Sequence, residues 1–218
     1  MTLTSNLTPN LTSRKLRGFS LLELMIVIGI GMTVAGISVM ALMPMLQENH
    51  IDQSYDTTLS VLRNYRNLAI SQSNRYIITF TPAGTTVPIS PATITVQFWG
   101  YAVPVSPAPV TVATYTLPTD VTFGVQSIFP AAAPDGFGTG VAAIDFDQAM
   151  GLGSQNYVMF MPDGSSQDTL GNYNSGIVYM TRTGDPYRSR ALTVWGTTGR
   201  IRGWRIYNQS GANVWTQQ

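Results

Sequence analysis

A predominantly apolar run of 28 residues, 19–46, constrains the fold of this chain more than any other feature. It reads FSLLELMIVIGIGMTVAGISVMALMPML, and its single charged residue is Glu23. A helix of this length spans about 42 Å, whereas the hydrocarbon core of a bilayer is roughly 30 Å thick. Three basic residues precede the run, namely Arg14, Lys15 and Arg17. The pattern predicts a membrane-spanning helix at about residues 19–46, with the N-terminus in the cytoplasm and the C-terminal region outside.

An ordinary cleaved signal peptide fits this pattern poorly. Such a peptide has an apolar core of about 7–15 residues, followed by a small-residue cleavage site. Here the run is longer, and no Ala-x-Ala sequence follows Leu46. Glu23 lies one helical turn from the start of the run, where lipid headgroups relieve part of the roughly 2.5–3.5 kcal/mol that a charge costs at the bilayer centre. An interfacial glutamate is the simplest interpretation of Glu23, but the residues around it suggest another.

Residues 17–24, with the sequence RGFSLLEL, resemble the processing site of type IV pilin and pseudopilin precursors. The resemblance implies that a prepilin peptidase cleaves between Gly18 and Phe19 and that the new terminal Phe19 is N-methylated. It also implies that Glu23 is an assembly residue, which pairs with the terminal amine of a neighbouring subunit in a filament. The implied fold class is α+β and pilin-like, with a long N-terminal α-helix packed against a C-terminal antiparallel β-sheet domain.

The domain organisation follows from this interpretation and from composition. We expect a cleaved leader at residues 1–18, a long helix at 19–74 and a β-rich extracytoplasmic domain at 75–218. The roughly 145 residues after the helix suffice for one domain with its own core. Only 11% of the chain is charged, and Gly, Pro, Thr and Ser are abundant, which favours β-structure. There is no cysteine, so the domain holds together without disulfides.

Apolar residues at helical spacing continue beyond the membrane span. They form one stripe that consists of Ile51, Tyr55, Leu59, Leu62, Ala69 and Ile70. We expect the helix to end near residues 73–74, with a kink or local melting at Pro44. Three acids four residues apart, Glu48, Asp52 and Asp56, share another stripe. That stripe is either a solvated face or a docking surface for a neighbour's arginines.

After residue 75 the apolar period changes to two, which predicts β-strands. The expected strands are 76–80, 93–99, 110–116, 141–146, 157–161, 177–181, 191–195 and 200–207. Residues 162–164 (PDG) predict a turn, and residues 197–199 (TTG) predict a hairpin connection. Residues 82–134 match no motif and are either strands joined by long loops or a variable surface insertion. Pro104, Pro107 and Pro109 argue against a central strand there.

The C-terminal half narrows the resemblance. FMPDG at 160–164, residues 176–180 and residues 192–196, followed by GRIR at 199–202, look like the carboxyl-terminal half of the H-type pseudopilin/T-type fimbrial minor pilin family (GspH/FimT). This likeness implies a minor pilin or pseudopilin, a structural subunit of a type IV pilus or of a type II secretion pseudopilus. Such a subunit is a single-pass protein of the bacterial inner membrane with a periplasmic C-terminal domain. Its implied partners are the prepilin peptidase and other pilins.

Arginines gather near the C-terminus, where only one acid, Asp185, accompanies them. They are Arg182, Arg188, Arg190, Arg200, Arg202 and Arg205. Arg200 and Arg202 should project to one face beside the hairpin turn, and Gly203 would permit a bulge that re-aims Arg205. In the T-type minor pilins the Gly-Arg-x-Arg region is implicated in DNA binding for uptake. Arg190, Arg200, Arg202 and Arg205 are therefore candidate DNA contacts, and the alternative is a solvated or subunit-contacting basic edge.

The reactive side chains predict no enzyme. Cysteine is absent and His50 is the sole histidine, which excludes thiol catalysis and ordinary zinc sites and disfavours a Ser-His-Asp triad. We expect His50 to face water or lipid headgroups. Asp145 with Asp147, and Asp163 with Asp168, offer oxygens to calcium, but turn capping and solvation explain them more simply. We therefore expect no catalytic residue, no metal and no cofactor.

Overall fold

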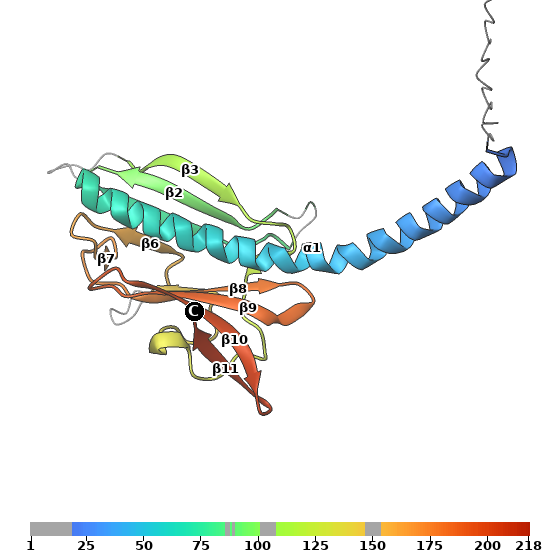
Figure 1. Ribbon diagram of the computed structural model, residues 1–218. Coiled ribbons are helices and arrows are strands. Elements are labelled where there is room, and N and C mark those ends of the chain that lie inside the picture. Colours follow the sequence, from blue (N-terminus) through green and yellow to red (C-terminus); the bar gives the residue numbers. More distant parts are fainter. Residues whose placement is uncertain (1–18, 86–87, 89, 101–107, 147–153) are drawn as a thin grey trace, which may run out of the picture. The chain divides into compact units, whose positions relative to one another are not determined.

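This computed structural model describes residues 19–85, 88, 90–100, 108–146 and 154–218, with only the backbone described for residues 40–48 (Figure 1). The chain divides into two compact units, Met1–Met45 and Leu46–Gln218. We describe each unit by itself. Helix α1, Leu21–Gln72, contributes to both units, and every strand in the described residues belongs to the second.

Helix α1 runs without interruption for 52 residues. Its backbone stays helical through Pro44, so the local melting expected there is not seen. Proline removes one helical hydrogen bond, and the neighbouring turns keep theirs. The helix ends where the sequence predicted, because Ser73 takes a left-handed φ of 51°. The Asn74 N–H then donates to Ala69 O at 3.2 Å and the Ser73 N–H to Ile70 O at 3.4 Å, which is the Schellman arrangement.

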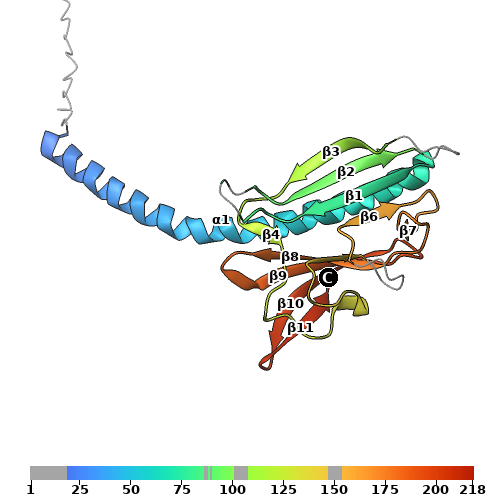
Figure 2. The ribbon, with the colours of Figure 1, turned by 180° about the vertical axis from the view of Figure 1, so that it is seen from behind.

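The described strands form two antiparallel sheets (Figures 1 and 2). Sheet A has the order β3-β2-β1-β6-β7, with bounds β1 Arg75–Thr81, β2 Thr93–Trp99, β3 Val110–Thr116, β6 Tyr157–Phe160 and β7 Ser166–Gln167. Sheet B has the order β11-β10-β9-β8-β4, and β5 pairs with another part of β8. Its strands are β4 Val121–Phe123, β5 Ile144–Phe146, β8 Gly176–Arg182, β9 Asp185–Val194, β10 Ile201–Gln209 and β11 Ala212–Gln217.

Most strands lie where the period of two placed them. The bounds of β2 and β3 equal the predicted ranges, and β3 is an edge strand, as the prolines before it suggested. The expectation of no central strand within 82–134 is wrong for β2, which contains no proline and lies between β1 and β3. The predicted strand at 141–146 is shorter and spans only Ile144–Phe146. Three strands were missed. β4 and β7 have three and two residues, too few to show a period, and β11 is a polar edge strand at the end of sheet B.

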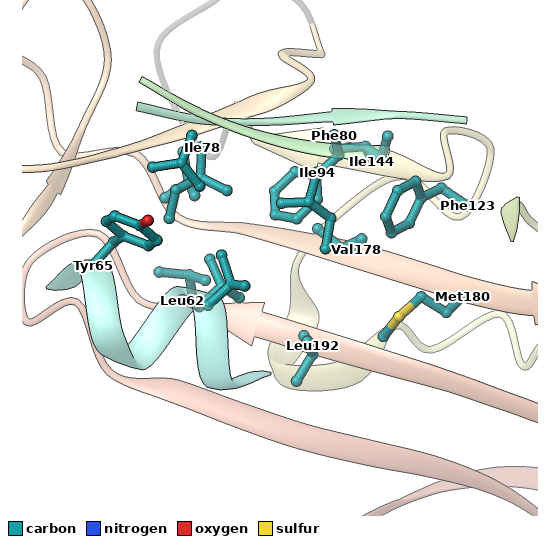
Figure 3. Packing of buried hydrophobic residues seen from close by; sticks show 14 of the residues in the cluster. Leu62, Tyr65, Ile78, Phe80, Ile94, Phe123, Ile144, Val178, Met180 and Leu192 are labelled. Atoms are coloured by element: carbon teal, nitrogen blue, oxygen red, sulfur yellow. The ribbon is translucent and has the colours of Figure 1, made fainter. Parts of the chain in front are cut away.

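The main core of the second unit lies between α1 and the facing sides of both sheets. Figure 3 shows Leu62 and Tyr65 of α1 among Ile78, Phe80 and Ile94 of sheet A and Val178, Met180 and Leu192 of sheet B. Of the predicted helical stripe, Ile51, Tyr55, Leu62 and Ala69 are buried, Leu59 is half-buried and Ile70 is exposed. The buried face also includes Ser54 and Thr58, whose hydroxyls donate to the carbonyls four residues earlier at 2.7 Å.

A second apolar cluster covers the opposite face of sheet B. It contains Ile177, Tyr179 and Ala191 of the sheet and Phe137 of the 124–140 segment. The aromatic side chains of Phe129 and Trp215 pack edge to face above Tyr179, with ring centroids 5.0 Å apart. The strand β8 is therefore covered on both faces, which is why its residues read as a continuous apolar run.

The structure gives Gly203 a role different from the predicted bulge. The pairing of β10 with β9 runs in continuous register from Ile201 to Arg205, so no bulge occurs at this glycine. Instead, the phenol of Tyr55 on α1 lies directly over the Gly203 backbone, where the hydroxyl oxygen occupies the space that a Cβ atom would take. Glycine is therefore required by the close approach of helix and strand.

We expect the substitution Gly203→Ala to lower the free energy of unfolding by about 1–3 kcal/mol, because the added methyl group collides with Tyr55. Urea unfolding of the full chain in detergent, followed by tryptophan fluorescence, measures this loss. The double variant Gly203→Ala with Tyr55→Phe should recover part of it, since the nearest atom is then absent. A Gly203→Ala chain as stable as the wild type would show that the two elements do not meet in this way.

Candidate functional site

The N-terminal unit exposes an apolar helical surface. Leu21–Val39 is the one span in the described residues that is long and apolar enough to cross a membrane, and none of it is buried within the chain. Phe19 is 80% exposed, and Glu23 lies exposed in the first turn of α1. Gly18, the other predicted processing residue, lies outside the described residues. An apolar surface of this extent needs lipid or other helices around it.

Two hydroxyl groups of this segment are satisfied within the helix. Thr33 Oγ1 donates to Ile30 O and Ser38 Oγ donates to Val34 O, each at 2.8 Å. Glu23 is the one charged side chain between residues 19 and 39. An acid in the first turn is favourably placed for the helix dipole, whether or not a partner is near. The segment thus presents a single charge on an apolar rod.

Two of the four candidate DNA-contacting arginines are bound to acids of the same chain. Arg190 on β9 is 2% exposed, and its guanidinium is hydrogen-bonded to the Asp52 carboxylate of α1. Its Nη1 also donates to Arg188 O at 2.9 Å. Burial lowers the pKa of Arg190, and the attraction of Asp52 opposes that shift. The sequence predicted that Asp52 faces either water or a neighbour's arginine, whereas it pairs with an arginine of its own chain.

Arg202 on β10 anchors the segment that covers sheet B. Its Nη1 lies 2.6 Å from Asp135 Oδ1, and its guanidinium carbon lies 5.4 Å from the centre of the Trp195 ring. The other Asp135 oxygen accepts hydrogen bonds from Thr193 Oγ1 at 2.6 Å and from Trp195 Nε1 at 3.1 Å. Asp135 lies in the short 3-10 helix η1, Pro134–Gly136, and its side chain is only 5% exposed.

The sequence suggested that His50 faces water or lipid headgroups, but its side chain also contacts an acid of the same chain. Its Nδ1 lies 2.8 Å from Asp120 Oδ1, and Arg182 Nε lies 2.9 Å from Asp120 Oδ2. Asp120 stands in the turn before β4, so this carboxylate joins α1 to the far end of β8. The pattern of the sequence gave no sign of this contact, because the three residues are separated by 70 and 62 positions.

The two remaining candidates differ in exposure and surroundings. Arg205 is half-buried, with its guanidinium carbon 5.2 Å from the centre of the Tyr207 ring. Arg200 is exposed beside the hairpin and lines an open cleft of about 510 Å³ together with Arg63 and Arg66 of α1. Arg200 and Arg202 therefore contact different parts of the fold. The helix arginines were missed because they lie more than 130 residues before Arg200.

Within this arginine cleft, two hydrogen bonds hold the Arg66 side chain in place. Its Nε donates to Gly164 O at 3.1 Å and its Nη2 donates to Thr198 O at 2.9 Å. Each of the two predicted turns thus supplies a carbonyl oxygen that accepts a hydrogen bond from the Arg66 guanidinium. Gly164 and Gly199 have positive φ angles of 81° and 60°, and a Cβ atom on Gly199 would collide with the Gly164 carbonyl and with Arg66. The two turns can approach this closely only as glycines.

The acids considered as calcium ligands accept hydrogen bonds from groups of the same chain. Asp145 Oδ2 accepts from the Thr139 N–H at 2.9 Å, Asp163 Oδ1 from Ser165 and Asp168 Oδ1 from Leu170. Asp147 lies outside the described residues. No group of three or more His, Cys, Asp or Glu side chains that could hold a metal ion occurs in the described part of the chain.

A family model, the prokaryotic N-terminal methylation motif, matches residues 13–39. The match covers the basic leader residues, the Gly18–Phe19 junction, Glu23 and the apolar helix. It indicates a type IV pilin-like protein. The motif implies processing by a prepilin peptidase and assembly with other pilins, and together with the apolar helix it suggests anchoring in the inner membrane. Searches of curated proteins and of solved structures found no significant match.

We expect the contribution of Asp120 to stability to depend on pH. Burial raises the pKa of Asp120, but the hydrogen bonds from His50 and Arg182 outweigh burial and hold it below its ordinary value. A lowered pKa stabilises the fold above the unfolded value of about 4, and this contribution is lost as pH falls through the folded pKa. Thermal unfolding of wild type and Asp120→Asn should therefore differ at pH 7 and converge towards pH 3. The exposed Asp56→Asn serves as the control, with no such difference.

We expect Asp135→Ala to cost about 3–5 kcal/mol of stability, because Arg202, Trp195 and Thr193 then lose their shared acceptor. Arg200→Ala, at an exposed position, should stay within about 0.5 kcal/mol of the wild type. Chemical unfolding of the full chain in detergent distinguishes the two. Equal losses in both variants would contradict the anchoring role of Asp135.

Proposed function

We propose that this chain is a minor pilin or pseudopilin, a structural subunit of a type IV pilus or a type II secretion pseudopilus. One observation supports this above all others. The segment that matches the methylation motif is an exposed apolar helix whose single charge, Glu23, lies in its first turn. In an isolated membrane anchor only the helix dipole stabilises that acid, whereas in a helix that assembles with copies of itself the acid can also pair with a neighbour's terminal amine.

Cleavage between Gly18 and Phe19 would create a positive amine one turn before Glu23. Within one copy, that amine and the carboxylate belong to the same helix end. In a bundle of parallel helices, the amine of one copy can neutralise the Glu23 of the next. The pairing would offset what remains of the roughly 2.5–3.5 kcal/mol that an unpaired charge costs at the membrane centre, and it would select one register between copies.

The β-domain would then form the surface of the filament in the periplasm. Its core is complete within the second unit, so it does not depend on neighbours for folding. A structural role rather than an enzymatic one agrees with the absence of cysteine and the presence of a single histidine, His50, in the chain. The finer assignment to the GspH/FimT family is part of this proposal and is supported by the C-terminal sequence likeness.

A DNA-binding tip subunit for DNA uptake is the second candidate. The exposed Arg200 beside Arg63 and Arg66 is the observation that favours it. Arg190 and Arg202 weaken it, because internal acids already neutralise both of them. A filament subunit that need not bind DNA is therefore the better-supported function.

Mass spectrometry of the protein from its own cells tests the processing step. The expected mass is that of residues 19–218 plus one methyl group.

Glu23→Leu should still be cleaved, but its amount in sheared filaments should fall at least about tenfold, since the amine loses its partner. Thr33→Leu is the matched control, because that hydroxyl bonds only its own backbone. A chain that retains residues 1–18, or a Glu23→Leu chain that assembles normally, would overturn the proposal.

A further inference from the structure

The outer side of α1 carries an acid and an arginine on one exposed line. Asp56, Ser60, Arg63 and Asn67 are all exposed, and their spacings of four, three and four residues place them on one ridge. Asp56 and Arg63 lie two helical turns, or about 10.5 Å, apart, which is too far for an ion pair within one copy. Among the described residues Asp56 makes no ion pair at all.

Two hollows of opposite charge border this ridge. On one side is an open groove of about 690 Å³ between α1 and Tyr115 of β3, in which Asp56 is the one charged lining residue. On the other side is the arginine cleft, lined by Arg63, Arg66 and Arg200 without any acid. The three guanidinium groups that line the cleft repel one another. A negative group would relieve this repulsion, and no acid of the same copy lines the cleft.

We infer that this ridge is a contact between successive copies of the chain, in which the Asp56 carboxylate of one copy binds the arginine cleft of the next. The inference rests on the proposed function, because it requires copies packed side by side. Arginine presents a planar fork of donors that suits a carboxylate, and the rigid placement of Arg66 by Gly164 and Thr198 lowers the entropy cost of forming such a site.

The geometry of the helix gives the displacement that this contact needs. Copies in the same orientation, shifted along the helix by two turns, bring Asp56 level with Arg63. Arginine side chains on a helix point towards its N-terminus, which reduces the shift that Arg63 requires. The outward-shifted copy contributes Asp56, and its neighbour contributes the arginine cleft.

Charge favours a carboxylate over a nucleic acid as the occupant. Without residues 1–18 the chain has nine arginines and eleven acids, so its net charge is negative. Asp56 stands two turns from the cleft and would repel a phosphate backbone that follows the helix. A second copy instead places its Asp56 carboxylate at the arginine cleft of the first. Its own Arg63 then faces the groove that contains Asp56 of a third copy, so each contact pairs an acid with an arginine.

Charge exchange in the full chain, expressed in its own cells, tests the inference. Asp56→Arg and Arg63→Asp should each lower the amount in sheared filaments about three- to tenfold, since both create like-charge pairs. The double variant Asp56→Arg with Arg63→Asp restores opposite charges and should return to within about twofold of the wild type. Gln209→Arg and Gln209→Asp, at an exposed residue of β10, are the controls and should assemble normally.

The other outcomes separate this inference from the proposed function. If all charge variants assemble like the wild type while Glu23→Leu does not, the Asp56 contact is wrong and the proposed function stands. If the double variant is not restored, and Arg63→Asp weakens retention of the purified full chain on DNA in a mobility-shift assay, the cleft binds a polyanion and the contact between copies is wrong. A wild-type chain absent from filaments overturns both proposals.

Discussion

The packing of one face of α1 against two sheets is the interaction on which the second unit depends. Four apolar side chains of that face, Ile51, Leu62, Tyr65 and Ala69, are buried in the same cluster as strands from both sheets. Each large side chain buried in this way contributes about 1.5–3 kcal/mol. The face also includes small residues and a phenol that lies over a glycine, so the helix approaches sheet B closely. Without this helix, the two sheets would expose the apolar sides that they now share.

Acid–arginine pairs add specific polar contacts to the apolar packing. Three acids from separate segments reach three strands of sheet B, in the pairs Asp52–Arg190, Asp120–Arg182 and Asp135–Arg202. Buried or partly buried pairs of this kind add little net stability, because desolvation cancels much of their attraction. What they provide is placement, since each carboxylate has one matching guanidinium. The excess of arginine near the C-terminus is therefore largely an internal arrangement, with Arg200 as the exposed exception.

The sequence predicted the features that depend on local order along the chain. The apolar run, the helix end near Ser73 and the edge position of β3 all follow from periodicity, turn chemistry or proline. Features that depend on distant contacts were not predictable in this way. Gly203 suggested a bulge because its reason, the Tyr55 ring, lies 148 positions earlier. Likewise, the arginine cleft joins two segments that no spacing rule connects, and the very short strands carry too little pattern to be seen.

The position of β8 has a consequence for how the domain opens. This strand is paired with β9 along one edge and with β5 and β4 along the other, and apolar clusters cover both of its faces. Its amide hydrogens can meet solvent only when several neighbouring strands separate together. Deuterium uptake at β8 therefore reports the cooperative unfolding of the whole domain, while uptake at the open edge of β3 reports only local fraying.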